Sequence, residues 1–151
     1  NLNSTVIGDY HNPTTRLPGS GGACEIAAHA KTTFVMAKAS PRSFVENLDF
    51  CSSAGFMTGH ASRKKPPATG QGPMIVITDF GVLTPLANEE LAVSALFSDI
   101  TLDEAKAMVG WQLQQHEQIE ILANPNENEL SVLRELLART KIANQVRKIP
   151  I

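Results

Sequence analysis

The sequence predicts an α/β protein in which helices flank a layered, open sheet, and three observations carry this prediction. Apolar runs rich in β-forming residues at Thr32–Ala37 and Met74–Thr78 predict buried strands. Apolar stripes that follow capping residues, at Thr101 and Asn126, predict helices. A glycine-rich turn at residues 17–22 runs directly into an alanine-rich helical pattern. Strands and helices of this kind favour a sheet covered by helices.

The first third of the chain surrounds the glycine turn. Leu2–Ile7 alternates apolar and polar residues and predicts a strand, which a polar loop with Pro13 and Pro18 follows. After the turn, Ala23–Ala30 predicts a short helix whose small side chains let it lie close to a sheet. Because Asn1 is not methionine and begins within the predicted strand, we expect that an N-terminal portion is missing.

The middle of the chain alternates short elements and loops. Phe44–Cys51 predicts a second short strand, and Gly55–Pro73 lacks periodicity and predicts a surface loop. Asp79 is expected to shape the turn toward Val82, since aspartate close to a glycine often does so. The residues of Leu91–Phe97 are compatible with a strand or a helix.

Two helices are predicted in the last third. Thr101 and Glu104 form a capping box, Gly110 is expected to end the helix, and Trp111 is expected to pack in the core. The apolar face of this helix consists of Leu102, Ala105, Met108 and Val109. The second helix spans Asn126–Thr140, and its apolar stripe consists of Leu130, Leu133, Leu136 and Leu137. We expect this helix to close the fold or to dock on a partner chain.

The composition is that of one globular domain, residues 1–151. The chain is 42% hydrophobic and 19% charged with a formal net charge of −2, which argues against nucleic acid or an anionic membrane as main partner. No apolar run approaches the ~20 residues of a membrane span, and the scattered histidines predict no metal site.

Cys24 and Cys51 are expected to be thiols, because so few cysteines suit a reducing cytoplasm. We interpret Cys24 as buried and inert.

The glycine turn is the strongest candidate site. Glycines at three of the four positions Gly19, Ser20, Gly21 and Gly22 indicate left-handed backbone or a ligand against bare backbone. Amides at a helix start stabilise negative charge, so an anion or carbonyl site and a tight packing turn are about equally supported. The dinucleotide fingerprint fails, because its last glycine would fall on Cys24, and the Walker lysine is absent.

The segment Gly19–Ala23 resembles the Gly-x-Gly-Gly-Ala motif of class I CoA-transferases, in the β subunit or C-terminal half, as in glutaconate CoA-transferase. Asn1–Thr5, Met74–Leu83 and Ile100–Trp111 resemble further segments of that family in the same order. The resemblance therefore spans nearly the whole chain. It implies a fold of the CoA-transferase and ribose-phosphate isomerase group, with a strand at Leu91–Phe97.

The resemblance also implies covalent transfer of coenzyme A between carboxylic acids through a glutamyl-CoA thioester. Gly21 and Gly22 are then expected to donate to the oxyanion of each step, and Gly19 and Ser20 to shape the acyl-CoA pocket. CoA esters are expected as substrates, with no tightly bound cofactor. An α subunit and a higher oligomer are the expected partners.

The nucleophilic glutamate of that family lies upstream of the glycine motif, and neither Glu25 nor Glu46 corresponds to it. Glu25 is interpreted as a first-turn helix acid. The chain alone is therefore expected to be catalytically incomplete. A CoA-ester decarboxylase or hydrolase on the same fold, and a non-catalytic assembly domain, remain as alternatives.

Three adjacent cations, Arg63, Lys64 and Lys65, lie in the predicted surface loop. Such a cluster can contact the phosphates of coenzyme A. A loop whose cations face only solvent is the alternative, and it is favoured about three to one.

Overall fold

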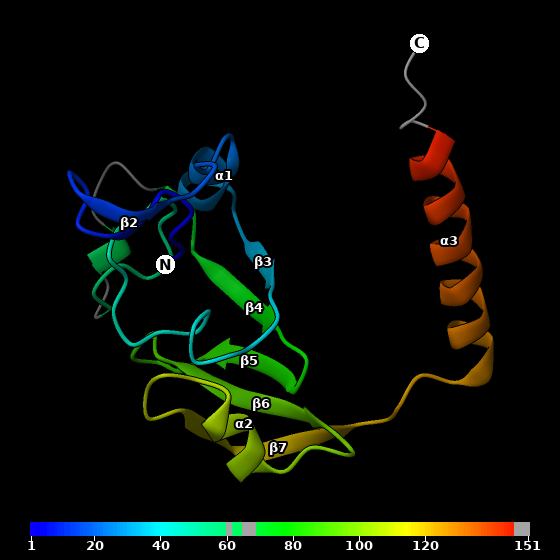
Figure 1. The fold of residues 1–151 in the computed structure, drawn as a ribbon. Helices are drawn as coiled ribbons and strands as arrows, with labels where there is room; N and C mark the ends of the chain where they lie inside the picture. The colour runs from blue at the N-terminus through cyan, green and yellow to red at the C-terminus, as the bar shows by residue number, and fades with distance from the viewer. Residues whose placement is uncertain (60–61, 65–68, 147–151) are drawn as a thin grey trace.

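The computed structural model describes residues 1–59, 62–64 and 69–146, and these form two sheets and their flanking helices (Figure 1). The smaller sheet pairs β1 (Val6–Gly8) with β2 (Pro13–Arg16). The larger sheet has the order β3 (Thr33–Met36), β4 (Pro73–Ile77), β5 (Gly81–Pro85), β6 (Leu91–Phe97) and β7 (Gln114–Leu122). The helices are α1 (Ala23–His29), the 3₁₀ turn η1 (Ser62–Lys64), α2 (Leu102–Ala107) and α3 (Glu127–Val146).

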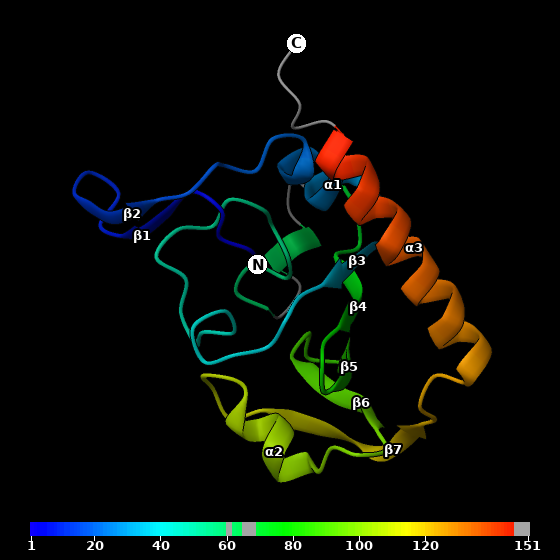
Figure 2. The ribbon, with the colours of Figure 1, turned by 45° about the vertical axis from the view of Figure 1, so that its right-hand side comes forward.

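The larger sheet is mixed. The outer pairs β3–β4 and β6–β7 are parallel, whereas β4–β5 and β5–β6 are antiparallel. The connection from β6 to β7 contains α2, as a parallel pair requires. The predicted open sheet with flanking helices is confirmed. The glycine turn joins β2 to α1 (Figures 1 and 2).

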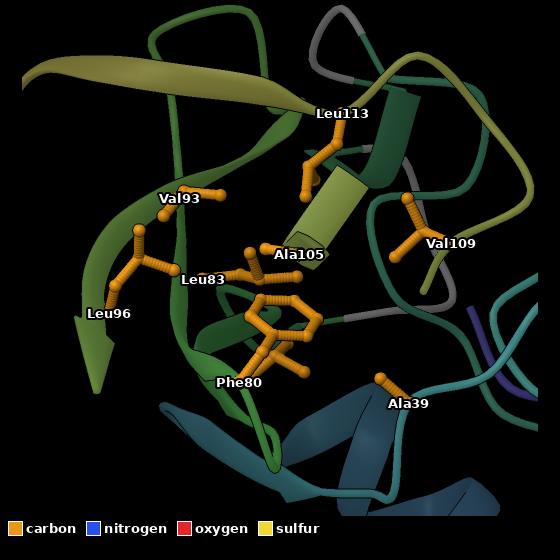
Figure 3. Close-up of a cluster of buried hydrophobic side chains, with 9 residues drawn as sticks. Ala39, Phe80, Leu83, Val93, Leu96, Ala105, Val109 and Leu113 are labelled. Atoms are coloured by element: carbon orange, nitrogen blue, oxygen red, sulfur yellow. The ribbon is translucent and has the colours of Figure 1, made fainter. Parts of the chain in front are cut away.

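The hydrophobic core lies between the larger sheet and α2 (Figure 3). Phe80 and Leu83 are completely buried at its centre. The cluster is completed by Ala39, Val76, Val93, Leu96, Ala105, Val109 and Leu113. The predicted inner face of α2 is confirmed, since Leu102 and Met108 also pack against this cluster. Trp111 is half-buried, and its ring stacks on Phe44 with ring centres 6.0 Å apart.

Both predicted helix caps are present. Thr101 and Glu104 form the reciprocal capping box of α2. At α3 the Asn126 side chain accepts from the Glu129 N–H at 3.0 Å, and the Glu129 carboxylate accepts from the Asn126 N–H at 2.9 Å. α3 extends beyond the predicted end to Val146. Among the described residues, no helix is both long enough and apolar enough to cross a membrane.

The two ends of the sheet depart from the predictions. β3 is a strand as predicted, but Phe34 and Met36 are 63% and 79% exposed, because nothing in the described chain covers their face of this edge strand. The opposite edge, β7, was not predicted, since its glutamines, glutamates and histidine give it a mostly polar sequence. Ile119 is its contribution to the core.

The N-terminal strand is shorter than predicted. Leu2 forms only an isolated bridge to Ser53, and β1 begins at Val6. The Asn3 side chain accepts from the Thr5 N–H at 3.0 Å and so forms a local turn that interrupts the extended chain. The loop predicted around Pro13 is also wrong, because β2 begins with this residue, at a strand position that tolerates a missing N–H.

The strand predicted at Phe44–Cys51 is wrong, because this segment consists of bends and irregular backbone. The Phe44 carbonyl accepts from the Gly110 N–H at 2.7 Å. A Cβ on Gly110 would lie 2.9 Å from that carbonyl, so the glycine allows a close backbone approach. Gly110 therefore does not end α2, whose last residue is Ala107.

Thr78, rather than Asp79, shapes the turn between β4 and β5. The Thr78 hydroxyl donates to the Gly81 carbonyl at 2.8 Å and accepts from the Gly81 N–H at 3.1 Å. The Asp79 carboxylate instead accepts from the Ala39 N–H at 2.7 Å. Asp79 thereby holds the segment after β3 against the sheet.

Candidate functional site

The candidate site is the glycine turn between β2 and α1. Gly19 and Gly21 have φ angles of +90° and +52°, a region that residues with a side chain rarely adopt. Gly22, the N-cap of α1, has φ −74°. Local conformation thus explains the first two glycines, and the third needs another reason.

Three successive amides of this turn have no acceptor in the part of the chain that the structure describes. The Gly19 N–H donates to the Ser4 carbonyl at 2.7 Å, and the Ala23 N–H donates to the Ser20 carbonyl at 3.0 Å. Between them, the N–H groups of Ser20, Gly21 and Gly22 make no hydrogen bond within residues 1–59, 62–64 and 69–146. The two flanking bonds fix both ends of the turn and leave its central donors available.

Open space adjoins these amides. A Cβ built on Gly19, Gly21 or Gly22 meets no heavy atom of the described residues within 4 Å. By contrast, a Cβ on Gly70 would lie 2.1 Å from the Ala30 carbonyl. Packing therefore does not require glycine at position 22, and an incoming group can reach its backbone.

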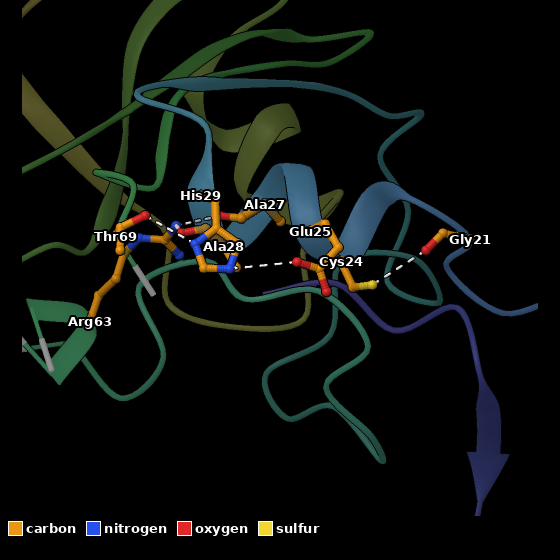
Figure 4. Close-up of polar contacts among 8 residues, drawn as sticks. All are labelled: Gly21, Cys24, Glu25, Ala27, Ala28, His29, Arg63 and Thr69. Carbon is orange, nitrogen blue, oxygen red and sulfur yellow. Dashed lines mark hydrogen bonds and ion pairs between the residues drawn. The ribbon is translucent and has the colours of Figure 1, made fainter. Parts of the chain in front are cut away.

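Polar side chains of α1 extend from Cys24, beside the turn, to His29 at the opposite end of the helix (Figure 4). The Cys24 thiol donates to the Gly21 carbonyl at 3.3 Å. Glu25 is in the first turn of the helix, as predicted, and its carboxylate lies 3.5 Å from the His29 ring. The ring contacts the Thr69 hydroxyl at 2.9 Å on its other side. Both Glu25 and His29 are exposed, so they form a surface pair.

Both cysteines are free thiols, as predicted. Cys51 is exposed. Cys24 is half-buried rather than fully buried, because the turn in front of it is open to solvent.

Arg63 does not lie in a solvated loop, and the alternative favoured from the sequence is wrong for this residue. Its side chain is only 3% exposed. Its guanidinium donates to the carbonyls of Ala27 and Ala28, which Figure 4 shows, and also to those of Ala54, Gly55 and Gly70. These five bonds use the five N–H donors of the group and leave none for a coenzyme A phosphate.

Burial lowers the pKa of the Arg63 guanidinium, and the charge of Glu89 opposes this shift. Arginine nevertheless stays protonated in proteins. The Lys64 side chain and Lys65 lie outside the described residues. The predicted phosphate contact of these two cations therefore stays a prediction. The buried position of Arg63 could not be predicted from the sequence. All its acceptors are backbone carbonyls, and a pattern of side chains does not indicate which carbonyls will lie together.

A second feature lies at the β7–α3 connection, away from α1 in both views (Figures 1 and 2). Phe97, Ala123, Pro125, Leu130 and Leu133 contribute to the lining of a hollow there. Farther along α3, Leu136 and Leu137 are 58% and 59% exposed. The predicted apolar stripe is therefore present, and much of it faces solvent.

Comparison with known proteins identifies the family. Residues 1–106 match the coenzyme A transferase family. The chain belongs to this family. The resemblance inferred from the motif at Gly19–Ala23 is thereby confirmed.

Two relatives within the coenzyme A transferases are B subunits. The chain is 42% identical to the B subunit of 3-oxoadipate CoA-transferase from Pseudomonas knackmussii, over 95% of this chain and 56% of the relative. It is 32% identical to the B subunit of glutaconate CoA-transferase from Acidaminococcus fermentans, over 89% of this chain and 51% of the relative. The chain thus spans about half the length of the curated relatives that it matches.

Solved structures support the fold. The crystal structure of glutaconate CoA-transferase from Acidaminococcus fermentans matches with a TM-score of 0.80 at 32% identity, over 89% of this chain and 52% of the matched chain. The decarboxylase AibA/AibB matches with a TM-score of 0.66 at 19% identity, over 87% of this chain and 49% of the matched chain. The second likeness concerns the fold alone.

Proposed function

We propose that this chain is part of an acyl-CoA transferase that moves coenzyme A between carboxylic acids. Family membership suggests the class of reaction. The observation that carries the proposal for this chain is the row of available amides at Ser20, Gly21 and Gly22, beside open space. Backbone N–H groups held in this way stabilise the negative charge of a tetrahedral intermediate without reorganisation.

In the proposed reaction a glutamate carboxylate attacks the carbonyl carbon of the acyl-CoA thioester. The CoA thiolate leaves, and an acyl-glutamyl anhydride remains. The thiolate then attacks the glutamyl carbonyl, which forms the glutamyl-CoA thioester and releases the first carboxylate. An acceptor carboxylate reverses these steps and departs as its CoA ester. Each addition produces an oxyanion, and we assign its stabilisation to the amides of Gly21 and Gly22, with Gly19 and Ser20 shaping the pocket.

The nucleophile is proposed to come from polypeptide outside residues 1–151. Glu25, the acid next to the turn, lies in the first turn of α1 and pairs with His29. Glu46 lies in an irregular segment. Neither occupies the place in the chain where the family carries its glutamate.

We further propose that the chain assembles with a complementary α subunit into a higher oligomer. The two relatives that are B subunits support this proposal. The exposed stripe of α3, which includes Leu133 and Leu136, is a suitable contact surface because apolar side chains gain free energy when a partner covers them. We place the enzyme in the cytoplasm, where its free cysteines stay reduced, and we propose acyl-CoA and carboxylate substrates without a tightly bound cofactor.

The decisive experiment traps the covalent intermediate. The full natural polypeptide that contains these residues is purified with its complementary subunit, here called the assembled enzyme. It is incubated with an acyl-CoA, treated with borohydride and digested for mass spectrometry. A glutamate reduced to an alcohol, in a peptide outside residues 1–151, supports the proposal.

Four results would count against it. Reduction of Glu25 or Glu46 would place the nucleophile in this chain. Loss of carbon dioxide from the acyl group would indicate a decarboxylase, and release of free CoA without an acceptor would indicate a hydrolase. Failure of the assembled enzyme to bind CoA esters in calorimetry would favour a non-catalytic assembly domain.

A further inference from the structure

Arg63 connects three segments that are distant in the sequence. Its Nε donates to the Gly70 carbonyl at 2.9 Å. Its Nη1 donates to the carbonyls of Ala54 and Gly55 at 2.9 and 2.5 Å. Its Nη2 donates to the carbonyls of Ala27 and Ala28 in the last turn of α1. A single buried side chain therefore joins α1 to two loops.

The contacts at α1 satisfy groups that a helix cannot satisfy itself. The last carbonyls of a helix lack partners within the helix, and a positive charge near them is favourable. The Ala28 carbonyl also accepts from the N–H groups of Thr69 and Gly70, at 3.0 and 2.9 Å. The C-terminal end of α1 is thus fixed by Arg63 and by the segment that Arg63 itself contacts.

α1 depends on these polar contacts because it has little else to hold it. The helix has seven residues, and none of them is buried. Isolated helices of this length are not stable in water, so tertiary contacts must supply the order. The same short helix begins directly after Gly21 and Gly22, and a displacement of its axis moves their amides.

We propose that Arg63 is a positioning residue that holds α1, and through α1 the available amides of the glycine turn, in the geometry needed for acyl transfer. This inference rests on the proposed function. Arg63 touches no reacting atom. It acts by fixing the far end of the helix, which a lysine cannot do equally well because its ammonium has three donors on a point charge instead of five in a planar fork.

The test compares Arg63→Ala and Arg63→Lys in the assembled enzyme, with Arg42→Lys as the control. Arg42 is exposed and gives a matched change at the surface. Amide hydrogen exchange of residues 20–30 is measured without substrate, together with thermal unfolding. Steady-state kinetics of CoA transfer then separate kcat from KM, and ethylguanidinium is added to Arg63→Ala to refill the vacated site.

We expect faster exchange in residues 20–30 of both variants, that is, in α1 and the glycine turn. We expect kcat to fall about 100-fold in Arg63→Ala, as a misplacement of about 1 Å costs, with a smaller fall in Arg63→Lys. The KM for acyl-CoA should change much less, and ethylguanidinium should restore part of kcat. The Arg42→Lys control should match the wild type.

The proposal is overturned if folded Arg63→Ala keeps wild-type exchange in α1, or keeps wild-type kcat. Collapse of folding in both variants would also overturn it, because Arg63 would then support the whole structure rather than α1. If the wild-type enzyme transfers no CoA, the proposed function fails, and the exchange data alone decide whether Arg63 positions α1.

Discussion

Substitution of Gly22 by alanine separates the two explanations of the glycine turn. With φ −74° and no heavy atom of the described residues within 4 Å of a Cβ placed here, alanine fits this position without strain. If the glycine only serves packing, the methyl group is harmless. If a thioester carbonyl approaches the Gly22 backbone, the methyl group stands in its path.

The expected change in stability is small. Replacing glycine restricts the unfolded chain and stabilises the folded state by about 0.4–1 kcal/mol where the conformation allows it. Alanine is a poorer N-cap than glycine, which offsets this by a similar amount, about 1 kcal/mol at most. The free energy of unfolding should therefore change by less than about 1 kcal/mol, or about 2–4 °C in melting temperature.

The expected change in catalysis is large. Alanine keeps the backbone N–H, but a methyl group that holds the carbonyl away from it has the effect of losing one oxyanion donor, about 3 kcal/mol or about 100-fold in kcat. The assay follows CoA esters by liquid chromatography during transfer from an acyl-CoA to a carboxylate, in the assembled enzyme. Gly21→Ala is the comparison, since its φ of +52° predicts a strain of about 1–2 kcal/mol in addition.

Transfer of CoA at the wild-type rate by folded Gly22→Ala would refute a carbonyl site at Gly22. A large loss of stability in Gly22→Ala would also contradict it, because the structure shows open space at this position. A normal melting temperature with a strongly reduced kcat is the result that supports a carbonyl site.

Three further predictions concern stability and assembly. Phe80→Ala should lower the free energy of unfolding by about 3–5 kcal/mol in denaturant titration, because the ring is completely buried; a loss below about 1 kcal/mol would contradict the core assignment. Hydrogen bonds from Thr101 lower the pKa of Glu104, so this carboxylate stabilises the fold above its unfolded pKa, and the stabilisation is lost as pH falls through the folded pKa. The stability difference between wild type and Glu104→Gln should therefore be full at neutral pH and shrink in acid; a difference independent of pH would refute it. Leu133→Ser with Leu136→Ser should weaken copurification of the complementary subunit while circular dichroism stays unchanged, and undiminished copurification would place the contact elsewhere.

Elements governed by neighbouring residues were predictable. The caps at Thr101 and Asn126 depend on side chains three residues away, and the structure contains both. The left-handed backbone at Gly19 and Gly21 follows from glycine's missing side chain. The strand at Leu91–Phe97 was predicted from the family resemblance and not from periodicity, because its residues were compatible with a strand or a helix.

Elements governed by distant partners were not predictable. β7 is a strand because it pairs with β6, although its own sequence is mostly polar. Phe34 is exposed because no described residue covers its face of the edge strand, although the run around it is apolar. In each case the deciding contact comes from another part of the chain, which a local pattern does not contain.

The candidate site also has features that follow from neighbouring residues and features that depend on distant segments. The order of residues from Gly19 to Gly22 by itself determined where bare backbone lies and indicated the family. Only the tertiary structure decided which amides are available, because the Ser4 carbonyl takes the Gly19 N–H and leaves the next three. It also decided that Arg63 is buried, since the guanidinium's acceptors are brought together from three separate segments. The order of residues along the chain determines local conformation. Backbone hydrogen bonds between distant segments exist only once the chain has folded.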